Sequence, residues 1–136
     1  MVEAFQRRRD FVVEGLNRIP GVRCQMPKGA FYVFPNVAGV VEALAAEEAH
    51  RGLPDGTRER SSPSTLVALF LLYRYRVATM DRRSFGVRGS EGQHFLRLSI
   101  ATGDDDLLEA LRRLEQAAAD QKGFADFVRS GERLTF

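Results

Sequence analysis

The clearest alternation of apolar and polar positions is the run Phe95-Leu96-Arg97-Leu98-Ser99-Ile100-Ala101. Branched and aromatic residues at this density are typical of a buried strand. Because side chains alternate between the two faces of a strand, residues 96, 98 and 100 share one apolar face. Arg97 falls on the other face, with residues 95, 99 and 101. The pattern predicts a central strand that carries an arginine on its second face.

Apolar residues recur at helical spacing in five other segments. These are residues 2–19, 37–49, 63–73, 103–122 and a short segment around 124–128. Ser62 and Pro63 supply a cap and a first helical position for the third segment. Thr102 is predicted to cap the fourth segment, and Gly123 is predicted to end it.

Three shorter segments are predicted to be strands. Residues 22–25 alternate in polarity, and residues 30–34 are dense in aromatics, so the short turn between them favours a hairpin. Residues 76–80 are the third candidate, while residues 52–62 contain turn formers and charges and are predicted to be a mobile loop. Together the elements predict an α+β fold with a small, mostly antiparallel sheet of three to four strands and helices packed on one side.

Composition narrows the class of protein. A chain of 136 residues with 44% hydrophobic and 28% charged residues is predicted to be one globular domain, residues 1–136. A net charge of +2 is too small to indicate nucleic-acid binding. One cysteine permits no internal disulfide and fits the reducing cytoplasm. The longest apolar run, residues 66–73, is shorter than the roughly 20 residues of a membrane helix, so no membrane partner is expected.

Other chemistries find little support in the residues. Cys24, His50 and His94 stand far apart in different kinds of segment, so no metal site is predicted. Ser99 lies within the predicted central strand and His94 at the end of a loop, which does not fit a serine hydrolase. No catalytic residue is predicted in this chain.

Arg97 is the strongest candidate for a binding residue. An unpaired buried charge is costly, so the guanidinium needs a partner, and its planar fork suits a carboxylate. A structural ion pair, or an arginine that reaches water along its aliphatic stem, is the competing interpretation. Residues 81–94, with three glycines, three arginines and Phe85, form either a binding loop or a solvated connection.

Three stretches together resemble the C-terminal small domain of the aspartate aminotransferase family, pyridoxal-phosphate enzymes of fold type I. The first runs from Arg7-Arg8-Arg9-Asp10 to Ile19-Pro20-Gly21-Val22 and is similar to the family's helix between the large and small domains. The second is Pro27-Lys28-Gly29-Ala30-Phe31-Tyr32-Val33-Phe34-Pro35, close to a Gly-Ala-Phe-Tyr strand. The third joins Val77-Ala78, Ser84-Phe85-Gly86 and Glu91-Gly92 to the predicted central strand.

The resemblance implies a function and a site. It places on Arg97 the binding of the substrate's α-carboxylate, and it makes Ser84, Phe85 and Gly86 a site-lining loop. Residues 81–83, Asp-Arg-Arg, stand where the family usually has a Pro-Gly step. The expected activity is transfer of an amino group between an amino acid and a 2-oxo acid, in a longer cytoplasmic enzyme that forms a homodimer.

The resemblance also implies a missing part. The family holds pyridoxal 5'-phosphate on a lysine, and neither Lys28 nor Lys122 lies in a setting like the family's lysine motif. The chain is therefore expected to be a fragment, inactive alone, whose cofactor is held mainly by a missing large domain. Two alternatives stay open: a free-standing α+β module that binds small carboxylates or dimerises, and a basic nucleic-acid adaptor.

Overall fold

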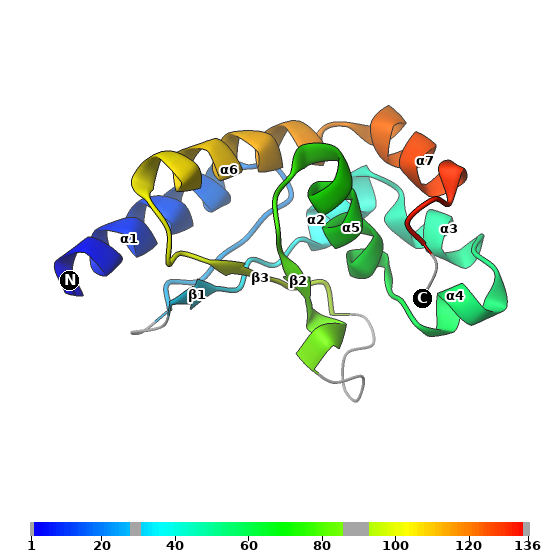
Figure 1. Cartoon of the computed structure of the whole chain (residues 1–136), viewed down its shortest axis with the longest axis horizontal. Helices are drawn as coiled ribbons and strands as arrows, with labels where there is room; N and C mark the ends of the chain where they lie inside the picture. Colours follow the sequence, from blue (N-terminus) through cyan, green and yellow to red (C-terminus); the bar gives the residue numbers. More distant parts are fainter. Residues whose placement is uncertain (1, 28–30, 86–92, 135–136) are drawn as a thin grey trace.

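The computed structural model describes residues 2–27, 31–85 and 93–134. Its elements in chain order are α1 (Val2–Arg18), β1 (Tyr32–Val33), α2 (Ala38–Ala43), α3 (Ala46–Arg51), α4 (Asp55–Glu59), α5 (Pro63–Tyr75), β2 (Met80–Asp81), the 3-10 helix η1 (Arg82–Phe85), β3 (Leu96–Ser99), α6 (Asp104–Ala118) and α7 (Gln121–Ser130) (Figure 1). The strands form an antiparallel sheet in the order β1–β3–β2. The expected α+β fold is confirmed, with β3 in the centre.

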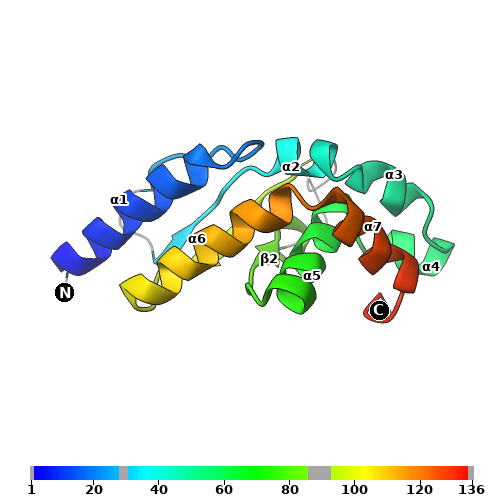
Figure 2. The ribbon, with the colours of Figure 1, turned by 90° about the horizontal axis from the view of Figure 1, so that it is seen from above.

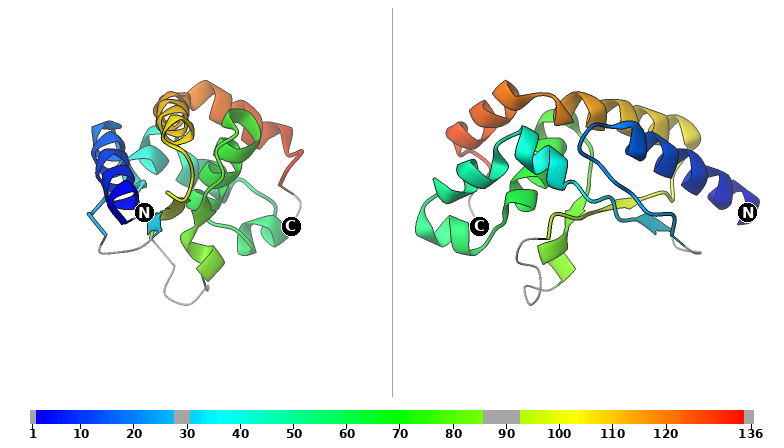
Figure 3. Two further views of the ribbon diagram at one scale, coloured as in Figure 1. Left: turned by 60° about the vertical axis from the view of Figure 1, so that its left-hand side comes forward. Right: turned by 180° about the vertical axis from the view of Figure 1, so that it is seen from behind.

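Burial alternates along β3 as the sequence pattern predicts. Leu96 and Leu98 are buried, whereas Arg97 is partly buried and Ser99 is exposed. Helices α1 and α6 lie side by side above the sheet (Figure 2). Within the described residues, no helix covers the opposite face of the sheet, which carries Arg97 (Figure 3). We call that opposite face the outer face and define it by Tyr32, Met80, Arg97 and Ser99.

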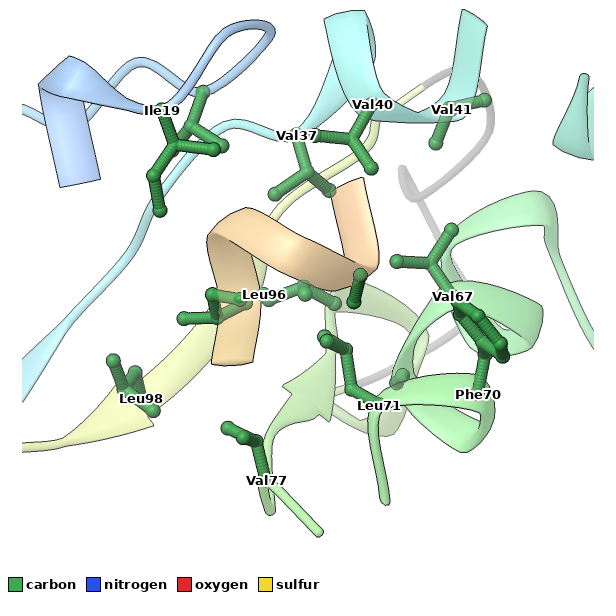
Figure 4. Close-up of a cluster of buried hydrophobic side chains, with 14 of the residues drawn as sticks. Ile19, Val37, Val40, Val41, Val67, Phe70, Leu71, Val77, Leu96 and Leu98 are labelled. Carbon is green, nitrogen blue, oxygen red and sulfur yellow. The ribbon is translucent and has the colours of Figure 1, made fainter. Parts of the chain in front are cut away.

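The hydrophobic core lies between the inner face of the sheet and the helices. Figure 4 shows Leu96 of β3 near side chains from α2 and α5, with Val40, Phe70 and Leu71 pointing into the same cluster. Phe70 and Phe124 are fully buried and meet edge to face, with ring centroids 5.4 Å apart. Burial of this apolar surface is the main force that holds β3 in place. None of the described helices is long and apolar enough to cross a membrane.

Helices α1 and α6 approach each other closely. A Cβ atom added at Gly15 of α1 would stand 2.7 Å from Cδ1 of Leu111 in α6. At the other end of this contact, Arg7 and Arg8 both donate to the carboxylate of Asp104, at 2.7 and 2.9 Å. Asp104 opens α6, so its charge also interacts favourably with the N-terminus of that helix.

A second close approach joins the end of α1 to α2. Gly21 adopts a φ of +90°, a conformation that glycine enters without steric cost. A Cβ atom added at Gly39 would stand 2.4 Å from the Cα of Gly21. The two backbones therefore pack directly against each other at this point.

Several predicted elements differ in detail. The segment 37–49 forms two helices, because Ala45 adopts a left-handed φ of 55° between α2 and α3. The predicted loop 52–62 contains the short helix α4. Its end is held by His50, whose Nε2 lies 3.2 Å from the carbonyl oxygen of Arg58 and 3.1 Å from that of Ser61.

The predicted hairpin is wrong. Residues 22–25 contribute a single bridge, from Arg23 to Asn36, and β1 pairs with β3 instead. The third predicted strand, 76–80, is shifted to Met80–Asp81, because Arg76 ends α5 in a left-handed conformation and Val77 donates to the carbonyl of Leu71. Residue 30 of the predicted second strand, with residues 28 and 29 of the predicted turn, lies outside the described part of the chain.

The helix ends are partly as predicted. Ser62 caps α5 and Pro63 is its first residue, as expected, and Thr65 completes a capping box. Gly103 rather than Thr102 occupies the N-cap of α6, and Gly123 lies inside α7 instead of ending α6. Asp120 accounts for the second difference, because its side chain accepts the backbone N–H of Gly123 at 2.9 Å and caps a new helix.

Candidate functional site

Arg97 lies at the centre of the outer face. Its cross-strand partner in β2 is Met80, and Ser99 of the same strand pairs with Tyr32 in β1. Tyr32 therefore lies diagonally across from Arg97, within reach of a long side chain. The hydrophobic burial of Leu96 and Leu98 on one face of β3 forces the Arg97 side chain onto the other.

Two side chains contact the Arg97 guanidinium from the neighbouring strands. Its Cζ atom lies 4.3 Å from the ring centroid of Tyr32, in a cation–π arrangement. Its Nη2 donates to the sulfur of Met80. Tyr32 and Met80 are themselves exposed, at 37% and 39% of their surfaces. Among the described residues, Arg97 is thus flanked on both neighbouring strands by side chains that are exposed.

A groove lies near this surface. It has a volume of about 600 Å³ and is lined in part by Cys24, Met26, Phe34 and Phe95. Burial raises the pKa of the Cys24 thiol above its ordinary value, although a backbone hydrogen bond with Phe34 lowers it. A thiol that stays protonated at neutral pH is a poor nucleophile, so the groove offers shape and apolar surface rather than a reactive cysteine.

The predicted site-lining loop is described only in part. Ser84 and Phe85 belong to η1, which follows β2 directly, while Gly86 lies outside the described residues. Arg83 ties η1 to the segment before α5, because its guanidinium donates to the backbone carbonyls of Glu59 and Ser61. Arg83, which stands where the family usually has a Pro-Gly step, therefore holds η1 in place after β2.

The remaining candidates have structural contacts. His94 lies 3.4 Å from a carboxylate oxygen of Glu47, while His50 holds the end of α4. In the part of the chain that the structure covers, no three His, Cys, Asp or Glu side chains lie close enough to hold a metal ion. The structure brings neither histidine to Ser99, which is exposed on the outer face.

Comparison with known proteins decides the family. Residues 1–114 match the model of the class I and II aminotransferases. The chain belongs to this family. It is 38% identical over 122 residues to the aspartate aminotransferase of Streptomyces avermitilis, covering 90% of this chain and 26% of that protein. It is 36% identical over 117 residues to an aspartate/prephenate aminotransferase of Cereibacter sphaeroides, covering 86% of this chain and 26% of that protein.

Solved aminotransferases share the fold. The aspartate aminotransferase of Rhizobium meliloti matches with a TM-score of 0.61 and 36% identity, over 85% of this chain and 25% of that one. An aromatic aminotransferase of Pyrococcus horikoshii matches with a TM-score of 0.62 and 29% identity, over 89% of this chain and 26% of that one. The chain spans about a quarter of the length of the aminotransferases it matches.

Tyr32 and Met80 are the site residues that sequence reasoning missed. Alternation along the strands does place both on a solvent-exposed face, but it does not say which residues face Arg97 across the sheet. That depends on strand register and order, which short strands with no tight hairpin leave undetermined. The resemblance to the Gly-Ala-Phe-Tyr strand included Tyr32 but gave it no role in the site. No motif included Met80.

Proposed function

We propose that this chain is the C-terminal small domain of a pyridoxal-phosphate-dependent aminotransferase, and that Arg97 binds the α-carboxylate of the amino-acid and 2-oxo-acid substrates. The observation that carries the proposal is the position of Arg97, central on the one sheet face that no described helix covers. The planar guanidinium has the geometry for two parallel hydrogen bonds to a carboxylate.

The outer face is also the surface that we expect the missing large domain to contact. The match to this chain covers about a quarter of each relative, so most of such an enzyme lies in other segments. Tyr32 and Met80 beside Arg97, and Phe34 close by, expose between 37% and 46% of their surfaces. An apolar surface around a charged group is suited to an interface that closes over a small polar ligand. We call the longer protein, with its large domain, the parent enzyme, and we expect it to be a homodimer.

The described residues do not form a site for the cofactor by themselves. The chain has two lysines. Lys122 is exposed in the first turn of α7, and Lys28 lies outside the described residues. The same fold occurs in a PLP-bound protein from Clostridium difficile 630, with a TM-score of 0.57 and 21% identity. We therefore assign the lysine and the phosphate-binding groups of the parent enzyme to its large domain.

The role of this chain in the reaction is to bind and orient. The cofactor of such an enzyme supplies a ring that takes up electron density from the substrate's α-carbon. Arg97 fixes the carboxylate on that carbon, and two parallel hydrogen bonds restrict rotation of the substrate about its own axis. Orientation of this kind accelerates the reaction because the reacting bond is already aligned when the substrate is bound.

Replacement of Arg97 tests the proposal. In the parent enzyme, Arg97→Ala should reduce kcat/KM for the amino donor about 10- to 100-fold, since a charge-assisted pair contributes roughly 1.5–3 kcal/mol. Arg97→Lys should recover only part of the loss, because an ammonium group cannot form the two parallel bonds. Steady-state kinetics of both half-reactions provides the measurement.

Arg133→Ala is a matched control. Arg133, like Arg97, lies over a tyrosine ring: its Cζ atom is 5.0 Å from the ring centroid of Tyr73. It belongs to the C-terminal segment and not to the sheet. Its loss should leave kcat/KM unchanged. Wild-type kinetics for Arg97→Ala, or a reading frame with no lysine-bearing large domain ahead of residue 1, would reject the proposal.

A further inference from the structure

The guanidinium of Arg97 is contacted from both neighbouring strands. Tyr32 on β1 places its ring centroid 4.3 Å from Cζ, and Met80 on β2 presents its sulfur to Nη2. The three side chains lie in a row across the outer face, because β3 is the central strand. This row, Tyr32–Arg97–Met80, is built from three separate strands.

A long, flexible side chain needs such contacts to present its fork in one orientation. An arginine carries about 2 kcal/mol of rotamer entropy, and the cost of ordering it falls on ligand binding unless the free protein has already ordered it. The ring face restricts movement perpendicular to the guanidinium plane. The sulfur, a weak acceptor, occupies one N–H and so limits rotation within the plane.

We propose that Tyr32 and Met80 are positioning residues that hold Arg97 ready for the substrate's carboxylate. The inference rests on the proposed function and extends it to two residues that need not touch the substrate. The ring of Tyr32 and the sulfur of Met80 contact the guanidinium from opposite neighbouring strands. The pair therefore restricts the orientations that the Arg97 guanidinium adopts before a carboxylate binds.

Kinetics of four variants in the parent enzyme tests this inference. Tyr32→Leu removes the ring and should raise KM for the amino donor about threefold to tenfold. Met80→Leu keeps the volume but removes the acceptor, and should raise KM about twofold to fivefold. In both variants kcat should change less than twofold, because Arg97 is still present and binds the carboxylate in the same way once the substrate has ordered it. Tyr32→Phe keeps the ring and should retain the wild-type KM.

Tyr73→Leu is the matched control. Tyr73 is another exposed tyrosine beneath an arginine, but it belongs to α5. Its loss should not change KM. Propionate, which carries a carboxylate without an amino group, should lose affinity as a competitive inhibitor in Tyr32→Leu and Met80→Leu by the same factors as the substrate.

A spectroscopic measurement on the 136-residue chain separates this inference from the proposed function. The ring current of Tyr32 should shift the Arg97 side-chain protons upfield in the NMR spectrum, and the shift should vanish in Tyr32→Leu and persist in Tyr32→Phe. Unchanged Arg97 resonances in Tyr32→Leu, or an unchanged KM in both Tyr32→Leu and Met80→Leu, would overturn the inference. If Arg97→Ala kept wild-type kinetics while the NMR shifts behaved as expected, the proposed function alone would fail.

Discussion

At the scale of single residues, charge and burial explain which polar groups are structural. Asp104 accepts from two arginines, and Arg112 and Arg113 both pair with Glu109 on the surface of α6. Hydrogen bonds from Arg112 and Arg113 lower the pKa of Glu109 to about 2. These charges link helices to one another or to themselves, and the outer face of the sheet is not among their contacts.

Tyr75 provides a pH-dependent test of the packing between α5 and α7. Burial, a hydrogen bond of 2.7 Å to Asp120 and the charge of that carboxylate raise the pKa of Tyr75 from 10.0 to about 12. The folded chain therefore holds the phenol proton more tightly than the unfolded chain, and stability should fall as the pH rises from about 10 to about 12. Urea unfolding midpoints between pH 9 and pH 12 measure this fall.

The contribution of Tyr75 can be isolated by comparison. Tyr75→Phe should flatten the decline in stability over that pH range. Tyr73→Phe, at an exposed position of the same helix, should retain it. Equal slopes for the two variants would show that Tyr75 does not hold its proton as the structure indicates.

At the scale of elements, the correct predictions were those that depend on residues close together in the sequence. The two-residue period of β3 and the start of α5 at Ser62 and Pro63 were both predicted, because each depends on neighbours in the chain. The break at Ala45 and the short helix α4 were not. Ala45 has no feature that requires a left-handed φ, and α4 is held by distant groups, including the guanidinium of Arg83.

The candidate site was predictable to the same extent. The alternation of apolar and polar residues placed Arg97 on the outer face of the sheet. The carboxylate-binding role expected for Arg97 came from the resemblance to the family motif. Its neighbours depend on which strands flank β3, and that order is set by packing across the whole sheet. The pairing of β1 with β3 rather than with residues 22–25 is the kind of long-range choice that local patterns do not encode.

The backbone contact between Gly21 and Gly39 gives an element-scale prediction. Gly39→Ala would place a Cβ atom 2.4 Å from the Cα of Gly21, and neither backbone can yield without moving α1 relative to α2. We expect the free energy of unfolding to fall by about 1–3 kcal/mol, measured by urea denaturation of the 136-residue chain.

Gly56→Ala is the control for that substitution. An added Cβ at Gly56 of α4 meets nothing within 4 Å. Alanine is also the better helix former, so this variant should match or slightly exceed the wild type in stability. Similar losses in both variants would mean that the close approach of Gly21 and Gly39 does not exist in solution.

At the scale of the whole molecule, the proposed function makes this chain one half of a substrate-binding arrangement. It spans about a quarter of its relatives, and its outer face carries an arginine among exposed apolar side chains. One arginine contributes too little to retain a small ligand against the entropy lost on binding. The 136-residue chain alone should therefore bind neither amino acids nor 2-oxo acids.

Titration calorimetry with aspartate, phenylalanine and 2-oxoglutarate measures this directly. No heat of binding is expected up to millimolar ligand. Micromolar binding by the isolated chain would support the alternative of a free-standing carboxylate-binding module, and loss of that binding in Arg97→Ala would show that Arg97 serves it.

The attachment of Asp104 to Arg7 and Arg8 has a mechanical consequence. Asp104 follows β3 after the linking residues 100–103 and binds both arginines of α1. Further along, α1 packs closely against α6 where Gly15 meets Leu111. Helix α1 is thus attached to the first turn of α6 by ion pairs and packs against the middle of the same helix. If α1 rotated about a hinge in the parent enzyme, these contacts would carry the rotation to α6, which continues from the strand that bears Arg97.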